Sequence, residues 1–424
     1  MIIASDFRLD HFADRILVSC GLKGDGFPDR MVFRLSHTAC AAVDVAEPNW
    51  AAMALLYPAM MMGQDLTIEA DLSPRLLYNM RNDLMALMRN YEPQLKDIQI
   101  EAGLSTPHIP DGPRDTMTGF SGGVDSFSTF VLFTRPDVPP SLRLTALAVF
   151  QVGALGPTET GEALLEPARE RCEVHAKDPG LNTYSLSSNM DAVFAPAGRF
   201  GPIDFRRTVG LRNSAAALLL QNGVDTYLPS GSVNYRSATY GPYSCTESLD
   251  PVLQPLLATE KLRVHPAGAG LSRIEKIALI ADNPEAHQCL SVCVSQVGNP
   301  RPTTTLNCSA CWKCVQTLLV LEVLGKEDLF RPVFDVDYYR SNRARLLQEL
   351  SIRGKRMNST VIPENIAFAR QHGLHVPEPR SALEQRVRRI AQRVLKGVTP
   401  DRQGSGVRAS PQSSSAAPLS SNRP

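Results

Sequence analysis

Short apolar runs alternate with stretches of helical periodicity between residues 115 and 325, and this pattern constrains the fold more than any other feature. The apolar runs, each of strand length, are residues 116–120, 144–150, 181–186 and 226–229. The stretches with helical spacing between them lie near residues 127–133, 161–175 and 211–222. This alternation predicts the α/β class, with a doubly wound parallel sheet covered by helices on both faces. Ligands bind such sheets beyond the carboxyl ends of the strands, so we expect the functional site in the first strand-to-helix turn.

Three further regions flank this pattern in a chain of 424 residues, a length that suggests about two or three domains. Residues 1–112 predict a small α+β domain, because strand-like runs surround a helical pattern at residues 74–90 and a stretch rich in Pro and Gly follows. The central domain is predicted at residues 115–325. Residues 326–397 are typical of a helical extension, and the low-complexity tail at 398–424 is expected to be disordered.

The charge balance narrows the classes of partner. Lys and Arg number 44 and Asp and Glu 43, which leaves a formal net charge of +1. No overall basic field attracts nucleic acid, so nucleic acid is not an expected partner. No apolar run reaches the roughly 18 residues that a membrane-spanning helix needs, so no membrane is expected. The first residues include acidic side chains and lack the pattern of a secretory signal, which predicts a cytoplasmic protein.

The turn after the first predicted strand has the residue types of a phosphate-binding loop. Residues 121–126 read Ser-Gly-Gly-Val-Asp-Ser. We expect Gly122 and Gly123 to turn with φ > 0 and to admit an anion, while Ser121 and Ser126 donate hydrogen bonds beside the free amides of the helix start. Bare phosphate would repel Asp125, which suggests that this carboxylate helps to hold a Mg²⁺ ion bridging phosphate oxygens. The alternative is an ordinary helix capped by Ser121 or Asp125.

A cysteine cluster near the end of the central region predicts a metal site. Cys308, Cys311 and Cys314 follow one another with two residues between each pair, so one knuckle can wrap a tetrahedral ion. Cys293 is preferred over Cys289 as the fourth ligand because it lies nearer to the other three. Four thiolates predict structural Zn²⁺, whereas three cysteines with an open position could hold an iron–sulfur cluster. Buried cysteines without any ligand are the remaining alternative.

The Ser-Gly-Gly-x-Asp-Ser segment resembles the signature of the N-type ATP pyrophosphatases, the PP-loop superfamily. Members of that superfamily cleave ATP between the α and β phosphates, adenylate a carboxylate or an oxo group, and let a nitrogen or sulfur nucleophile displace AMP. The resemblance implies that this loop binds the leaving pyrophosphate. It also implies an ATP-binding set, namely Ser121, Gly122, Gly123, Asp125 and Ser126.

The loop and the cysteine cluster together resemble the 7-cyano-7-deazaguanine synthase branch, which belongs to queuosine biosynthesis. Those enzymes convert 7-carboxy-7-deazaguanine to its nitrile with ATP and ammonia, and they carry a structural zinc. The resemblance covers residues 115–325 and includes the segments 209–213, 231–235 and 272–276.

These segments imply roles for three more side chains. Arg212 is suited to neutralise a phosphate or a substrate carboxylate, and Lys276 to contact phosphate, so that both join Asp125 as expected catalytic residues. Asn234 is expected to make polar contacts at the nucleotide site. The alternatives are a surface salt bridge for Arg212 and a solvated helix position for Lys276.

Two segments depart from the branch. Residues 150–153 lack its Tyr-Gly-Gln-x-His run, and residues 243–247 replace its Tyr-Pro-Asp-Cys-Arg substrate segment. Housekeeping members also lack a domain like residues 1–112. The chain resembles instead the longer relatives found in specialised bacterial gene clusters, including antiphage defence systems, and this resemblance leaves room for a different acceptor, such as a protein. Residues 1–112 would then be a docking surface for protein partners.

The expected function is that of an ATP-dependent carbon–nitrogen ligase with ATP, Mg²⁺ and Zn²⁺ as cofactors. It would adenylate a small-molecule carboxylate, 7-carboxy-7-deazaguanine or a related compound, and transfer it to ammonia or an amine, with release of AMP and pyrophosphate. One alternative is sulfur transfer to an RNA base, for which relatives use Cys-x-x-Cys pairs. The other is a non-catalytic nucleotide-binding subunit of a defence complex.

Overall fold

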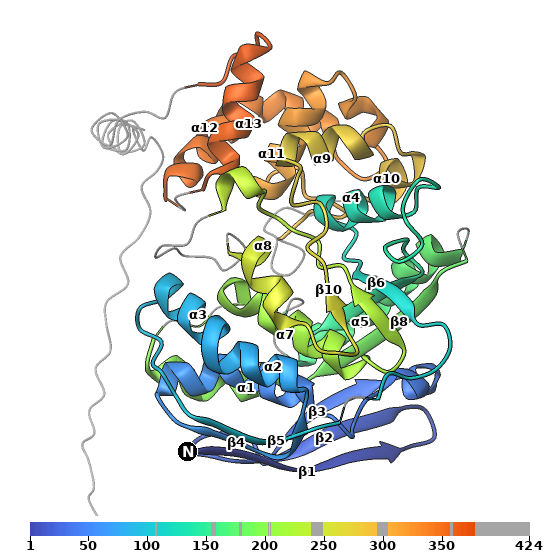
Figure 1. Ribbon diagram of the computed structural model, residues 1–424. Helices are drawn as coiled ribbons and strands as arrows, with labels where there is room; N and C mark the ends of the chain where they lie inside the picture. Colours follow the sequence, from blue (N-terminus) through green and yellow to red (C-terminus); the bar gives the residue numbers. More distant parts are fainter. Residues whose placement is uncertain are drawn as a thin grey trace, which may run out of the picture. The chain divides into compact units, whose positions relative to one another are not determined.

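A ten-stranded sheet organises the computed structural model (Figure 1). The structure describes residues 1–106, 108–153, 158–177, 180–201, 203, 205–238, 249–294, 304–356 and 359–377. The strands of this part of the chain are β1 (Ile2–His11), β2 (Ile16–Lys23), β3 (Arg30–Leu35), β4 (Leu66–Leu72), β5 (Ile100–Leu104), β6 (Asp115–Gly119), β7 (Ala146–Gln151), β8 (Asn182–Ser188), β9 (Val224–Tyr227) and β10 (Arg263–Val264). Their order across the sheet is β10-β9-β6-β7-β8-β3-β2-β1-β4-β5.

The helices of the described residues fall between and after these strands. They are α1 (Asn49–Met62), α2 (Pro74–Asn79), α3 (Met85–Tyr91), α4 (Val124–Phe133), α5 (Thr158–Lys177), α6 (Met190–Phe194), α7 (Phe205–Leu219), α8 (Asp250–Leu253), α9 (Arg273–Ile280), α10 (Pro284–Cys289), α11 (Trp312–Val323), α12 (Val336–Arg356) and α13 (Val361–Gln371). A π-helical turn, Met80–Leu84, joins α2 to α3. Helices α12 and α13 occupy the predicted helical extension, whereas its last part and the tail, residues 378–424, lie outside the described residues.

The predicted α/β class is confirmed, and the strands from β10 to β8 are parallel to one another. Strand β7 shows why its sequence is a continuous apolar run. Its residues alternate between two cores, with Ala146, Ala148 and Phe150 in one and Leu147 and Val149 in the other. Both faces of the strand are therefore buried, as expected when helices cover a parallel sheet on both sides.

The N-terminal strands continue this sheet. Strand β3 pairs antiparallel with β8, so that Phe33 lies opposite Ser188, and β2 and β1 follow in antiparallel register. Helices α1, α2 and α3 cover one face of this half of the sheet (Figure 1). The strands of residues 1–112 and those of residues 115–325 thus belong to one sheet, and the contacts of Met1–Pro377 group it as one unit.

The strand order places a topological switch point beside the predicted phosphate loop. From β6 the chain proceeds to β7 and β8 on one side and then to β9 and β10 on the other. The connections after β6 and after β9 therefore lead to opposite sides of β6 and β9, and the crevice of an open α/β sheet lies between two strand ends of this kind. Open α/β sheets bind their ligands in such a crevice.

Candidate functional site

The turn between β6 and α4 has one glycine in the left-handed region. Gly122 adopts φ +74°, whereas Gly123 is the N-cap of α4 with φ −81° and ψ 173°. The expectation of φ > 0 at both glycines is therefore wrong for Gly123, because a single reversal already turns the chain from strand to helix. No side chain caps α4 among the described residues. The alternative of a helix capped by Ser121 or Asp125 is thus not what the structure shows, and the first amides of α4 remain available to an anion.

The two serines of the turn hydrogen bond within it. The hydroxyls of Ser121 and Ser126 lie 3.3 Å apart, and Ser126 Oγ donates to the carbonyl of Gly123 at 3.1 Å. The amide of Gly123 donates to Ser121 Oγ at 3.3 Å. These contacts hold both hydroxyls at the start of α4, where the helix dipole favours negative charge.

Two cations from α9 contact the carboxylate of Asp125. Arg273 Nη2 lies 2.9 Å from Asp125 Oδ2, and Lys276 Nζ lies 3.2 Å from Oδ1. Burial disfavours the charged carboxylate, but the charges of Arg273 and Lys276 outweigh this effect and hold the pKa of Asp125 below its usual value of 3.8. Lys313 on α11 adds to the same effect. One carboxylate thus faces two close cations, which leaves positive charge in excess beside the turn.

Lys276 also ties the two sides of the crevice together. Its ammonium donates to the carbonyl of Gly231, in the connection that follows β9. Only 1% of the Lys276 surface is exposed, so the predicted alternative of a solvated helix position is wrong. The ammonium therefore bridges the turn after β6 and the connection after β9.

Arg273 is the site residue that the sequence reasoning did not assign. A capping box fixes the start of α9, because Ser272 and Glu275 hydrogen bond reciprocally to each other's backbone amides. Residues three apart on a helix share a face, so Arg273 and Lys276 point to the same side. The signal was present in the sequence as a capping box followed by this spacing.

Asn234 caps a short helical turn. Its Oδ1 accepts a hydrogen bond from the amide of Ser237 at 3.0 Å, and 7% of its surface is exposed. The side chain lies in the connection after β9, close in sequence to Gly231. The structure thus shows Asn234 as a cap in the connection after β9, and its expected contact with nucleotide stays a prediction.

Arg212 lies in the interior of α7 with its own set of partners. It pairs with Asp191 at 2.5 Å, donates to the carbonyl of Val152 at 2.9 Å and to Thr208 Oγ1 at 2.8 Å. Its guanidinium also lies 4.1 Å from the ring centre of Phe194. Arg212 is buried, so the predicted alternative of a surface salt bridge is wrong. Burial lowers the pKa of Arg212, and Asp191 opposes that shift.

The four cysteines that the sequence predicts as metal ligands form one cluster. The sulfur atoms of Cys293, Cys308, Cys311 and Cys314 all lie within 4.8 Å of one another. Sulfurs of Cys308 and Cys314 are 3.9 Å apart, and those of Cys311 and Cys314 are 3.4 Å apart. A tetrahedral zinc site with Zn–S bonds of about 2.3 Å has sulfurs about 3.8 Å apart, so the four thiols fit such an ion.

The cluster lies at the start of α11. Cys311 is the N-cap of this helix and Cys314 falls in its first turn, where the helix dipole favours thiolates. Hydrogen bonding with Cys293 lowers the pKa of Cys311 below its usual value. Cys293 completes the group, whereas Cys289, the alternative fourth ligand, ends α10 outside it. A four-thiol set of this kind can hold a metal such as zinc.

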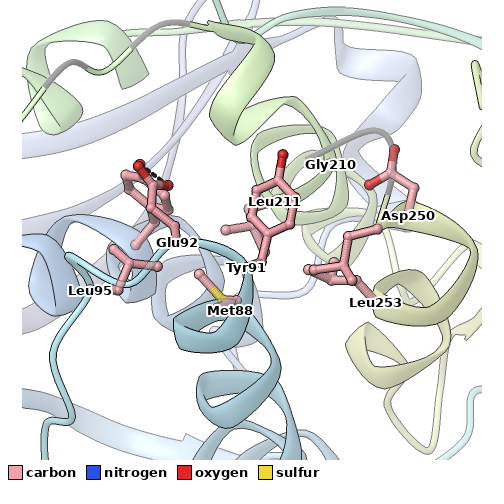
Figure 2. Close-up of a pocket in the computed structure, with 10 residues that line it drawn as sticks. Met88, Tyr91, Glu92, Leu95, Gly210, Leu211, Asp250 and Leu253 are labelled. Carbon is pink, nitrogen blue, oxygen red and sulfur yellow. Dashed lines mark hydrogen bonds between the residues drawn. The ribbon is translucent and has the colours of Figure 1, made fainter. Parts of the chain in front are cut away.

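A pocket lies between the N-terminal helices and α7 and α8. Glu92, at the end of α3, and Asp250, in α8, lie on opposite sides of it (Figure 2). Glu92 accepts a hydrogen bond from Tyr57 at 2.7 Å and pairs with Arg207. Burial and the neighbouring Glu92 carboxylate raise the pKa of Tyr57 well above its usual value. None of the predicted site residues lines this pocket.

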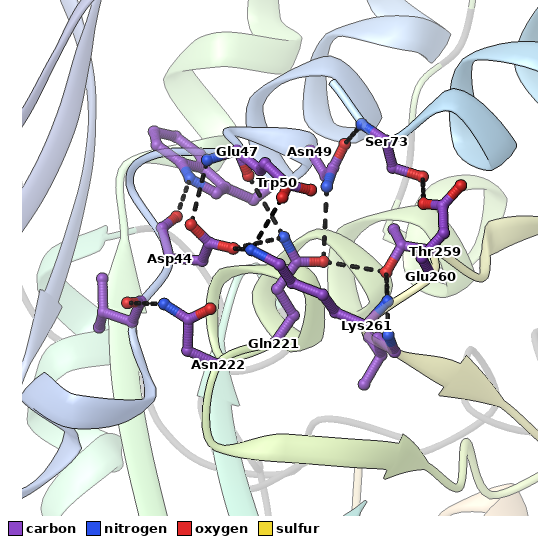
Figure 3. A network of polar contacts seen from close by, with 12 residues as sticks. Asp44, Glu47, Asn49, Trp50, Ser73, Gln221, Asn222, Thr259, Glu260 and Lys261 are labelled. Atoms are coloured by element: carbon purple, nitrogen blue, oxygen red, sulfur yellow. Dashed lines mark hydrogen bonds and ion pairs between the residues drawn. The ribbon is translucent and has the colours of Figure 1, made fainter. Parts of the chain in front are cut away.

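A buried charge cluster lies at the amino ends of the central strands, just before β10, whereas the turn after β6 lies at their carboxyl ends. Lys261 Nζ is 2.8 Å from Asp44 Oδ2 and 2.9 Å from Glu47 Oε1 (Figure 3). Gln221, which precedes β9, donates to the same oxygen of Asp44 at 2.8 Å, and Trp50 Nε1 donates to the Asp44 carbonyl at 3.1 Å. This network joins the N-terminal segment to the amino ends of the central strands.

Comparisons with family models, with curated proteins and with solved structures find no match for this chain. The substrate segment that departs from the resembled branch, residues 243–247, lies outside the described residues. Among the described residues, no helix combines the length and the apolar character needed to cross a bilayer. The turn and the cysteine cluster are therefore the two parts of the molecule whose geometry bears on function.

Proposed function

We propose that this chain binds the polyphosphate of ATP at the turn between β6 and α4 and uses it to activate a carboxylate. The observation that carries the proposal is the position of residues 121–126 at the switch point of the sheet, with uncapped amides of α4 and the cations of Arg273 and Lys276 beside them. Helix-start amides and a glycine turn are a general anion-binding arrangement. Two cations with one carboxylate add the charge that a phosphate group requires.

Asp125 has a role that depends on what occupies the turn. Without an anion it neutralises Arg273 and Lys276. A bound pyrophosphate group would attract both cations more strongly than a single carboxylate does, and Asp125 would then be free to hold Mg²⁺ through its oxygens. Magnesium would supply further charge neutralisation of the phosphates, so that catalysis is mainly positioning and electrostatics.

The reaction proposed is that of a carbon–nitrogen ligase similar to 7-cyano-7-deazaguanine synthase. The carboxylate of 7-carboxy-7-deazaguanine or a related compound attacks the α phosphate, pyrophosphate leaves into the turn, and ammonia or an amine displaces AMP. Arg212 would neutralise the phosphate or the carboxylate of the transferring group. To do so, its guanidinium would exchange Asp191 for that group. A role in antiphage defence and protein partners for residues 1–112 follow from the resemblance alone, and the cytoplasmic location follows from the pattern of the first residues.

The four cysteines would hold structural Zn²⁺ and stabilise the segment around α11. All four thiols belong to one group within 4.8 Å, which leaves none of them apart as a persulfide carrier. This favours the ligase over sulfur transfer to an RNA base. Elemental analysis should find about one zinc per chain. Iron with labile sulfide would support the sulfur transferase instead, and the absence of both metals would refute the metal assignment.

The products of ATP cleavage test the reaction. Incubation of the full chain with labelled ATP and 7-carboxy-7-deazaguanine should give AMP and pyrophosphate, and release of ADP and phosphate alone would overturn adenylation. Asp125→Asn keeps the size of the side chain and should abolish turnover. Metal-free pyrophosphate should bind this variant at least as tightly as the wild type, because the Asp125 carboxylate no longer competes with it for Arg273 and Lys276. A failure to release pyrophosphate with any acceptor, while ATP still binds, would indicate a non-catalytic nucleotide-binding subunit.

A further inference from the structure

One buried side chain connects the cysteine cluster with the phosphate-binding turn. We propose that Asn307 is a positioning residue that couples metal binding at the cluster to anion binding at the turn. The inference rests on the proposed anion site and assigns it a regulator, the occupancy of the cysteine cluster.

Asn307 is fully buried and all of its side-chain hydrogen-bonding groups are used for the backbone. Its Oδ1 accepts from the amides of Val292 at 2.8 Å and Cys293 at 3.1 Å. Its Nδ2 donates to the carbonyls of Leu290 at 2.7 Å and Val333 at 3.0 Å. The amide thus holds residues 290–293 in place along their length, from the residue immediately before Cys308.

Residues 290–293 carry contacts to both sites. The amide of Ser291 donates to the carbonyl of Gly122 at 2.8 Å, which fixes the left-handed residue of the turn from outside. Two residues later, Cys293 supplies its thiol to the cluster. The packing is close, because a Cβ placed on Gly122 would lie 3.5 Å from Cβ of Ser291. A shift of Cys293 therefore reaches the turn over a path of only two residues.

Metal binding should stabilise this arrangement because it fixes Cys293 and Cys308 on both sides of the Asn307 hydrogen bonds. Loss of the metal frees Cys293, loosens residues 290–293 and removes the support of Gly122. Coupling of this kind is reciprocal and amounts to about 5- to 150-fold in affinity in typical cases. We expect the affinity for inorganic pyrophosphate to fall about tenfold when the metal is removed.

The experiment uses the full chain and inorganic pyrophosphate as the probe. Titration calorimetry on the metal-loaded protein and on the reduced, chelator-treated protein gives the ratio of the two dissociation constants, with circular dichroism to show that the fold persists. In a second measurement, an excess of chromogenic chelator reports the rate of metal release, which pyrophosphate should slow. Free pyrophosphate binds metal and would by itself draw it away from the protein. A slower release of metal into the excess of chelator therefore reports pyrophosphate that is bound to the protein.

Variants of Asn307 test its part in the coupling. Asn307→Ala should bind pyrophosphate weakly with or without metal, so that the ratio approaches one while the four cysteines still take up metal. Asn307→Asp keeps the two bonds to the amides of Val292 and Cys293 and should retain part of the ratio, which guards against a simple folding failure of the alanine variant. Asn365→Ala is the control, because Asn365 is also fully buried but its side-chain amide makes no hydrogen bond among the described residues.

The outcomes separate the coupling from the proposed function. Equal pyrophosphate affinity in the metal-loaded and metal-free wild type, or a ratio that Asn307→Ala leaves unchanged, would overturn the coupling while the anion site stands. A metal-loaded wild type that binds no pyrophosphate at all would overturn the anion site itself. A tenfold ratio that is lost in Asn307→Ala and kept in Asn365→Ala supports the role of Asn307.

Discussion

Lys261 and Lys276 are two buried lysines of one sheet that lie in opposite charge environments. Lys261 precedes β10 at the amino ends of the central strands, and its ammonium contacts the carboxylates of Asp44 and Glu47. Lys276 lies at the carboxyl ends, and it shares the single carboxylate of Asp125 with Arg273. The exposed fractions are 6% for Lys261 and 1% for Lys276, so burial does not distinguish them.

The difference lies in which sign of charge remains. Two carboxylates around Lys261 leave no demand for an anion, and Gln221 and the amide of Glu47 donate further hydrogen bonds to the Asp44 carboxylate. At Lys276, two cations around one carboxylate leave a positive charge in excess beside uncapped helix amides. A buried lysine therefore indicates a binding site only when its surroundings lack the counter-charge, and the same residue type otherwise joins parts of the fold.

The largest effect is expected at the Lys261 cluster. Lys261→Met leaves Asp44 and Glu47 buried without their cation, and breaking a buried pair in this way costs about 3–5 kcal/mol of the free energy of unfolding. Urea denaturation measures this loss. Pyrophosphate affinity per folded molecule should stay at the wild-type value, since the cluster lies at the amino ends of the strands and the turn at their carboxyl ends. A change below about 1 kcal/mol would show that the network is not structural.

The pH dependence of that loss has a defined direction. Burial disfavours the ammonium, but hydrogen bonds to Asp44 and Glu47 outweigh it and raise the pKa of Lys261 above its usual value of 10.5. A raised folded-state pKa gives stability that is fully present below the unfolded-state value and is lost as the pH rises through the folded-state value. The stability gap between wild type and Lys261→Met should therefore narrow as the pH rises above about 10.5.

A smaller and different effect is expected at the other lysine. Lys276→Met removes one of the two cations beside the turn, and a hydrogen bond to a charged group contributes about 1.5–3 kcal/mol, so pyrophosphate affinity should fall about 10- to 100-fold. Calorimetric titration measures it, and Lys261→Met is the matched control. If the two variants lowered affinity equally, the distinction between the structural and the anion-binding lysine would be lost.

The sequence predicted the local features of the chain, its strands, helices and cysteine spacing, better than the long-range contacts between them. Strand and helix alternation is a property of short windows, so β6, β7, β8 and β9 were predicted, as was the grouping of Cys293 with the other three cysteines, whereas the two-residue strand β10 was not. Helix α1 was missed because all fourteen of its residues are buried, which removes the amphipathic period. The pairing of β3 with β8 and the contact of Arg273 with Asp125 join residues about 150 apart, and no local pattern encodes such contacts.

The smallest effect concerns the two glycines of the turn, which the sequence treats alike and the structure does not. Gly122→Ala forces a residue with a Cβ into φ +74°, which costs about 1–2 kcal/mol, although the space around it is sufficient. Gly123 has φ −81°, so Gly123→Ala carries no such backbone strain; its Cβ would lie 3.3 Å from Ser121 Oγ, which must shift slightly, and the loss in the free energy of unfolding should be smaller than for Gly122→Ala.

Anion binding should reverse this order if the turn is the phosphate site. A methyl group on Gly123 would stand at the N-cap of α4, where the amides meet the ligand, and it should weaken pyrophosphate binding more than it affects folding. Gly122→Ala should lower stability first and affinity only through the altered turn. Urea denaturation and calorimetric titration of both variants give the two effects separately, and a Gly123→Ala variant with wild-type affinity would remove this turn from the anion site.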